Sequence, residues 1–200
     1  NDAVRLPQDE APSHRLSTVF LNRRSARDLG PCSLAELAAV LIRSTRVLER
    51  AQGPDGYPVS RRPVPSAGAR HPIELAILAV AVHDLPCGFW TLEPDQGTIS
   101  PAFPDVDLER VIAAVRLVGR LSRSPAGVIF LIAEFKRTLS LYPGGGHLVW
   151  LDAGALALAL HLNATDVGLG STLVATSGQI LKAGLDETRQ DLVAVAFGRR

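Results

Sequence analysis

The stretch over residues 147–167 constrains this chain most, because it is a long helical segment that is apolar nearly all round. Its few polar residues are Asp152, His161, Asn163 and Asp166. A helix without a polar face has to be buried on several sides. In a chain of 200 residues, this predicts either a central helix or a helix that is buried in a subunit interface.

Length and composition indicate one globular domain. Of the residues, 46% are hydrophobic and 20% are charged, which is enough apolar material for a sizeable core. We expect residues 1–12 to form a flexible leader and residues 13–200 to form a single domain. The net charge of +1 gives no indication of a nucleic-acid partner or a membrane surface.

The termini and the cysteines indicate a cytoplasmic protein. The start of the chain is polar and does not resemble a signal peptide. The longest apolar run, residues 153–160, is too short to cross a bilayer. Cys32 and Cys87 are isolated, so their spacing suggests neither a zinc site nor a disulfide. We therefore expect no metal and no membrane partner.

Helices are expected at four places besides the long one. Ser13 is a candidate cap for the first helix, and Ser33 with Glu36 forms a capping box for the second. A third helix is expected to start near Asp105, and a short one is expected to start at Ser177.

Strands are expected over residues 73–82, 89–92, 128–133 and 192–197, and residues 44–60 are typical of a surface loop. The first two strands are joined by too short a turn for a parallel crossover, so they form an antiparallel pair. The pattern predicts an α+β fold, with helices on the faces of a sheet.

The segment over residues 61–72 has the composition of a ligand-contacting loop. Its three prolines keep it mostly extended, and Ser66, Ala67 and Gly68 carry no bulk that would hold a ligand away from the backbone. Arg62 and Arg70 make its surroundings positive. Such a loop suits a flat or anionic ligand, although a plain connection between a helix and a strand has the same composition.

Arginines are also clustered at two distant places. Arg23, Arg24 and Arg27 surround Ser25 near the start, and Arg199 is followed by another arginine at the end. If the fold joins these places, several guanidinium groups could bind a phosphate. The alternative is a set of solvated surface arginines.

No nucleophile–base pair stands out. The five histidines lack a neighbouring serine or cysteine in a recognisable elbow, and a Gly-x-Ser-x-Gly motif is absent. We expect His161 to be a hydrogen-bonded core residue. Asp152, an acid within an apolar helix, is expected to pair with an arginine.

Two motifs together resemble the nitroreductase-like flavoproteins. They are Arg-Arg-Ser-Ala-Arg at 23–27 and Pro-Ser-Ala-Gly at 65–68, the latter followed by Pro72, Glu74 and Leu75. Within that family the sequence looks closest to the SagB-type dehydrogenase branch, which includes azoline oxidases of ribosomal-peptide tailoring. The resemblance spans about residues 16–199 and continues in Asp-Ala-Gly at 152–154, Gly-Leu-Gly at 168–170 and the closing Phe-Gly-Arg at 197–199.

The resemblance implies an α+β fold with a mostly antiparallel central sheet, and FMN bound at a homodimer interface where long apolar helices pair. It implies that the FMN phosphate and ribityl chain are held by Arg23, Arg24, Ser25, Arg27 and Arg199, with Arg200 as a further candidate. It also implies that the isoalloxazine ring lies between a loop of the other subunit and a backbone segment of this one. The loop is Pro65, Ser66, Ala67 and Gly68, and the segment, after the Gly-Leu-Gly turn, is Leu173, Val174 and Ala175.

The sequence departs from the family pattern at two places. Azoline-oxidising members carry a Lys-Tyr pair where this chain has Leu141 and Tyr142, so Tyr142 remains the candidate proton donor or base. Residues 155–160 are alanine and leucine, where the family often has His and Gln. The resemblance therefore implies an FMN-dependent oxidoreductase that moves hydride through flavin N5, with NAD(P)H as a candidate reductant and a small-molecule or peptide-derived substrate. The alternative is a catalytically silent binding or scaffold subunit.

Overall fold

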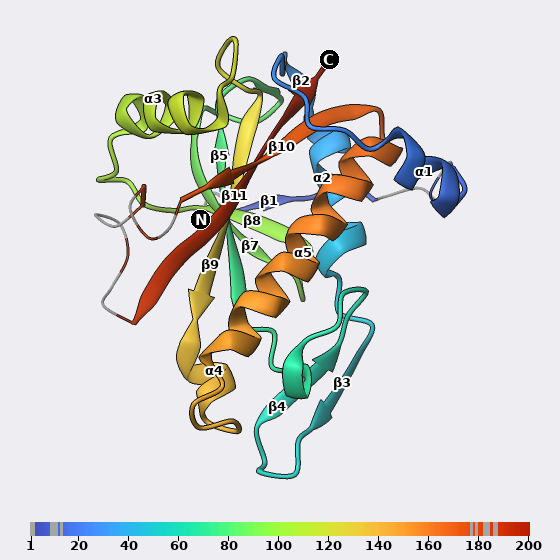
Figure 1. The fold of residues 1–200 in the computed structure, drawn as a ribbon, viewed down its shortest axis with the longest axis vertical. Coiled ribbons are helices and arrows are strands. Elements are labelled where there is room, and N and C mark those ends of the chain that lie inside the picture. Colours follow the sequence, from blue (N-terminus) through green and yellow to red (C-terminus); the bar gives the residue numbers. More distant parts are fainter. Residues whose placement is uncertain are drawn as a thin grey trace.

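A seven-stranded sheet forms the centre of the molecule (Figure 1). The computed structural model describes residues 3–8, 12, 14–176, 178, 180, 181, 185 and 188–200. The strand order is β1-β8-β7-β5-β9-β11-β10, and each neighbouring pair is antiparallel. The strands are β1 Val4–Arg5, β5 Ile73–Ala79, β7 Gly88–Glu93, β8 Thr98–Pro101, β9 Gly127–Glu134, β10 Leu169–Ala175 and β11 Arg189–Arg199. The predicted mostly antiparallel sheet flanked by helices is confirmed.

Helices cover both faces of this sheet. The helices α2 (Leu34–Thr45) and α5 (Gly146–Asp166) share one core with alternate strand residues such as Ile77. The helix α3 (Leu108–Gly119) shares the other core with the intervening residues, such as Leu78. This division follows from the period of two in a strand, which sends successive side chains to opposite faces. Both faces of β5 and β9 are therefore buried, as their continuous apolar sequences predict.

Smaller elements surround the sheet. They are the helices α1 (Leu16–Asn22) and α4 (Phe135–Leu139), the 3-10 turn η1 (Ala67–Ala69), the parallel pair β2 (Cys32–Ser33) with β6 (Val82–His83), and the hairpin β3 (Glu49–Gln52) with β4 (Pro58–Arg61).

The predicted capping box fixes the start of α2. The Glu36 backbone N–H donates to Ser33 Oγ, and the Ser33 N–H donates to Glu36 Oε2. Helix α3 starts at Leu108, capped by Asp107, rather than near Asp105 as expected. Ser13 and Ser177, the other candidate caps, lie outside the described residues.

Two expectations about chain segments are wrong. Residues 44–60 do not form a plain loop, because they contain the end of α2 and most of the β3–β4 hairpin. Residues 169–175, where no strand was expected, form the edge strand β10. Within residues 1–12, Val4–Arg5 pairs with β8 and Leu6 is buried in the core.

The long helix α5 has almost the predicted bounds. It is 21 residues long, and among the described residues it is the one helix whose length and composition would suit a bilayer. The apolar run over residues 153–160, on which the expectation about a bilayer was based, is only part of this helix. Core helices of soluble proteins meet the same description. Its inner face is packed in the main core through residues such as Val149, Ala153 and Leu160.

Candidate functional site

The segment after α1 lies against the C-terminal strand. Ser25 forms an isolated parallel bridge with Ser171 of β10, and Gly30 forms an antiparallel bridge with Arg199 of β11. The Gly30 N–H donates to the Arg199 carbonyl at 2.6 Å, and the Arg199 N–H donates back at 2.9 Å. The two ends of the domain that carry the arginine motifs are therefore adjacent, and Figure 1 shows the segment between α1 and β2 passing beside the C-terminal end of β11.

His161 connects α5 to this region. Arg23 Nη1 lies 3.0 Å from His161 Nε2, and Ser171 Oγ is hydrogen-bonded to Nδ1. Because the guanidinium can only donate, Nε2 accepts and Nδ1 carries the proton. Burial, followed by the charges of Arg23 and Arg200, lowers the pKa of His161 to about 4. The expected hydrogen-bonded core histidine is thus present, and it orients an arginine of the motif.

Arg24 and Arg200 line a cavity of about 400 Å³. The cavity is bordered by α1, by the end of α5 and by the start of β10, and among its described lining residues there is no acidic side chain. Arg27 Nη1 donates to Thr172 Oγ1 of β10 at 2.6 Å. We call Arg23, Arg24, Arg27 and Arg200 the arginine cluster.

Arg199 differs from the cluster in the direction of its side chain. Its Nε and Nη2 both lie 3.0 Å from Glu36 Oε1 on α2. Arg200, which follows the end of β11, lies close enough to His161 to contribute to the lowering of its pKa. The guanidinium that lines the cavity is that of Arg200.

The loop of Pro65, Ser66, Ala67 and Gly68, here the 65–68 loop, lies at the other end of α5. Asp152 of α5 accepts a hydrogen bond from Ser66 Oγ at 2.6 Å and one from the Ala67 N–H at 3.2 Å. Ser66 Oγ in turn accepts the His71 N–H at 2.9 Å. The expectation that Asp152 pairs with an arginine is wrong, since its buried carboxylate holds this loop instead. No local pattern in the sequence indicated that contact, whose partners are 85 and 86 residues apart.

Gly68 is required where it stands. Its φ is +60°, and a Cβ there would lie 2.8 Å from Leu141 Cδ2 and 3.2 Å from Tyr142 Cε2. A side chain would therefore be strained and crowded at once. The close approach brings Tyr142, which is 37% exposed, next to the loop.

The other loop arginines have structural partners. Arg70 is buried, is ion-paired with Asp55 and lies over the Tyr57 ring at 4.3 Å from its centre, while Arg61 is ion-paired with Glu49. Of the predicted ring-contacting strand residues, Val174 is buried in the core and Leu173 and Ala175 are exposed.

Within one chain the arginine cluster and the 65–68 loop do not meet. Their anchors on α5, His161 and Asp152, are nine residues apart, which corresponds to about 14 Å along a helix. Between and beside them α5 presents exposed apolar side chains, Trp150, Leu151 and Leu158.

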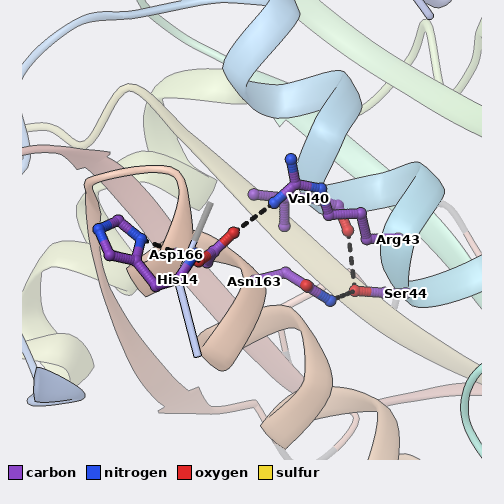
Figure 2. Close-up of polar contacts among 6 residues, drawn as sticks. All are labelled: His14, Val40, Arg43, Ser44, Asn163 and Asp166. Carbon is purple, nitrogen blue, oxygen red and sulfur yellow. Dashed lines mark hydrogen bonds and ion pairs between the residues drawn. The ribbon is translucent and has the colours of Figure 1, made fainter. Parts of the chain in front are cut away.

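Figure 2 shows how the end of α5 is fixed to α2 and to His14. The buried Asp166 carboxylate accepts from Arg43 Nη1 of α2 at 2.6 Å and from His14 at 3.0 Å. Asn163 donates to Ser44 Oγ, which donates to the Val40 carbonyl. His14 also lines the cavity of Arg24 and Arg200, so this network supports that cavity directly.

The low pKa of His161 predicts a loss of stability in acid. An unfolded histidine has a pKa of about 6.5, whereas the folded one has about 4, so the unfolded chain binds the proton first. His161 should therefore destabilise the fold as the pH falls from about 6.5 to about 4, and contribute nothing above that range. As the pH falls across this range, the midpoint temperature of thermal unfolding should decline less for His161→Gln than for the parent. Equal declines would contradict the assignment.

Comparisons with known proteins agree on the fold. No protein-family model matches the sequence. A protein of Methanocaldococcus jannaschii that is assigned as a nitroreductase is 27% identical over 177 residues, which cover 86% of this chain and 84% of that protein.

Solved structures are similar over nearly the whole chain. A crystal structure of an assigned nitroreductase from Ralstonia eutropha has a TM-score of 0.78 at 19% identity and covers all of this chain and 90% of that one. The Escherichia coli microcin synthetase McbBCD complex, with a truncated pro-MccB17 bound, matches at a TM-score of 0.69 and 20% identity, over 98% of this chain and 76% of that one. The NADPH:FMN oxidoreductase of Vibrio harveyi matches at a TM-score of 0.58 and 14% identity, over 92% of this chain and 68% of that one. The resemblance to the nitroreductase-like proteins is thereby confirmed, and this chain has the nitroreductase fold.

Proposed function

We propose that the protein is an FMN-dependent oxidoreductase of nitroreductase type that acts as a homodimer. The observation that carries this proposal is the cavity lined by Arg24 and Arg200, in which no described acidic side chain offsets their charge. A phosphate monoester is the anion that such paired guanidinium groups bind well. Arg23 and Arg27, which contact His161 and Thr172, would hold the phosphate and ribityl chain together with Ser25. Arg199 would act from further away, since Glu36 already neutralises it.

The 65–68 loop fits the flat ring of a flavin. Ala67 and Gly68 offer no more than a methyl group, and the Asp152 contacts fix the backbone that would face the ring. The strand β10, at the edge of the sheet, offers a second surface through the exposed Leu173 and Ala175. These features support the assignment of both segments to the isoalloxazine.

A two-fold pairing of α5 would join the two halves of the site. Each chain carries the arginine cluster at one end of α5 and the 65–68 loop near the other, and Trp150, Leu151 and Leu158 are exposed on the helix. An antiparallel pair of such helices brings one chain's cluster to its partner's loop, and buries these apolar side chains at the same time. The homodimer follows from the need to complete the site.

The flavin, when bound, supplies hydride transfer at N5, so the protein needs no nucleophile of its own. The protein's part is to bind the cofactor, exclude water from the ring and place a proton. We assign the proton step to Tyr142, whose ring lies beside Gly68. NAD(P)H is the proposed reductant for a small-molecule substrate, a role suggested by the NADPH:FMN oxidoreductase neighbour.

A peptide-derived substrate, as in the SagB-type dehydrogenase branch, is the second candidate, suggested by the microcin synthetase neighbour. Leu141, in place of the lysine of azoline oxidases, disfavours azoline oxidation itself. We propose a cytoplasmic setting, in keeping with the free thiols of Cys32 and Cys87. The alternative function is a silent scaffold subunit, which the loss of that lysine favours.

The flavin content of the purified protein tests this proposal. We expect a yellow protein that releases close to one FMN per chain on denaturation, and whose bound flavin is bleached by NADPH or NADH without oxygen. A colourless protein that takes up no added FMN would favour the scaffold function.

A further inference from the structure

A second cavity, of about 480 Å³, lies beside the 65–68 loop. It is lined by the end of α2, by β5 and β7, and by Asp152 and Leu156 of α5. It shares no lining residue with the cavity of Arg24 and Arg200. Its volume is in the range of small-molecule sites in proteins, and the proposed cofactor does not account for it.

Arg62 is the notable residue of this cavity. Its side chain is half-buried, its Nε donates to Ser60 Oγ at 3.0 Å, and no described carboxylate lies within ion-pair distance of it. Burial and the charges of Arg137 and Arg50 lower its pKa, and Asp95 opposes them. A partly buried guanidinium with two free terminal nitrogens is costly unless an anion binds there.

Most of the acidic groups that line the cavity are already bound. Glu74 is ion-paired with Arg137 and lies 3.5 Å from Arg189, and Asp95 is ion-paired with Arg50 at 2.6 Å. Asp152 accepts its hydrogen bonds from the 65–68 loop.

The remaining acid, Glu93, is exposed to solvent. Among the described cations that line the cavity, Arg62 is therefore the one without an ion-pair partner.

We propose that this cavity binds a small monocarboxylate with an apolar body. The two terminal nitrogens of Arg62 match the two oxygens of a carboxylate. Leu75, Leu92 and Leu156 line the cavity and suit an apolar body. A phosphate dianion is disfavoured, because Glu93 and Asp95 also line the cavity.

The site is independent of the flavin but adjacent to its proposed loop. Ser66 and Asp152 line the cavity and also make the contact that holds the loop. A ligand bound here would therefore pack against the inner side of that contact.

Isothermal titration calorimetry on the full chain, with and without FMN, tests the proposal. The probes are benzoate, phenylacetate and octanoate, with phenylacetamide as the uncharged match and phenyl phosphate as the dianion. We expect at least one carboxylate to bind, and phenylacetamide and phenyl phosphate each to bind at least about tenfold more weakly, as the loss or mismatch of a charged hydrogen bond predicts. Failure of all three carboxylates, or equal binding of the amide or the phosphate, would overturn the proposal.

A matched pair of variants locates the site. Arg62→Gln should abolish carboxylate binding, whereas Arg61→Gln, which changes the exposed neighbour paired with Glu49, should leave it unchanged. Binding by Arg62→Gln as tight as the parent's would place the anion elsewhere and refute the assignment. Circular dichroism confirms folding, and should Arg62→Gln not fold, the comparison of phenylacetate with phenylacetamide on the parent decides.

Discussion

Replacing Arg24 and Arg200 together with alanine is expected to weaken FMN binding by about 100-fold or more. Each hydrogen bond to a charged group contributes about 1.5 to 3 kcal/mol, and about 1.4 kcal/mol corresponds to a tenfold change in affinity. These two side chains line the cavity without an acidic partner among the described residues. Fluorescence titration of the flavin-free protein measures the change.

Two single variants serve as controls for this result. Arg116→Ala, which changes an exposed arginine of α3, should leave FMN affinity unaltered. Arg199→Ala should lower FMN affinity much less than the double variant does, because the Arg199 guanidinium is bound to Glu36. A loss from Arg199→Ala as large as that of the double variant, or full retention by the double variant, would contradict our placement of the phosphate.

Replacing Arg43 with methionine is expected to lower the free energy of unfolding by about 3 kcal/mol, the usual cost of removing one partner from a buried ion pair. Arg43 and Asp166 are 11% and 5% exposed, with 2.6 Å between Nη1 and Oδ2. Because methionine keeps an apolar side chain of similar length, the decrease in the free energy of unfolding measures the loss of the charged group. Urea unfolding curves of the two proteins give the difference from their midpoints and slopes.

The paired change Arg43→Met with Asp166→Asn provides the control. Removing both charges should restore part of the stability, because no buried carboxylate then remains without the guanidinium that balances its charge. A single variant within about 1 kcal/mol of the parent, in the range of an exposed ion pair, would mean that Asp166 does not depend on Arg43.

Local sequence signals predicted the elements whose formation depends on neighbouring residues in the sequence. The all-round apolar pattern gave α5 to within a residue or so, and Ser33 with Glu36 gave the start of α2. The adjacency of residues 23–27 and the C-terminal strand was also expected, but through the resemblance, since no local rule relates segments so far apart.

The remaining features depend on tertiary contacts. The partner of Asp152 lies in a distant loop, so only the fold could replace the expected arginine with Ser66 and Ala67. The choice between Arg199 and Arg200 depends on the register of β11, in which a shift of one residue exchanges the faces. The strand β10 was missed because its residues follow directly on the turn that ends α5.

In the homodimer that we propose, each site is built from the arginine cluster of one chain and the 65–68 loop of its partner. Mixing two flavin-free variants, Arg24→Ala with Arg200→Ala in one chain and Gly68→Val in the other, tests it most directly. Random exchange makes half of the dimers mixed, and each mixed two-fold dimer has one intact site, so FMN should occupy about a quarter of all sites. A mixture that stays flavin-free, while native mass spectrometry shows mixed dimers, would contradict the claim.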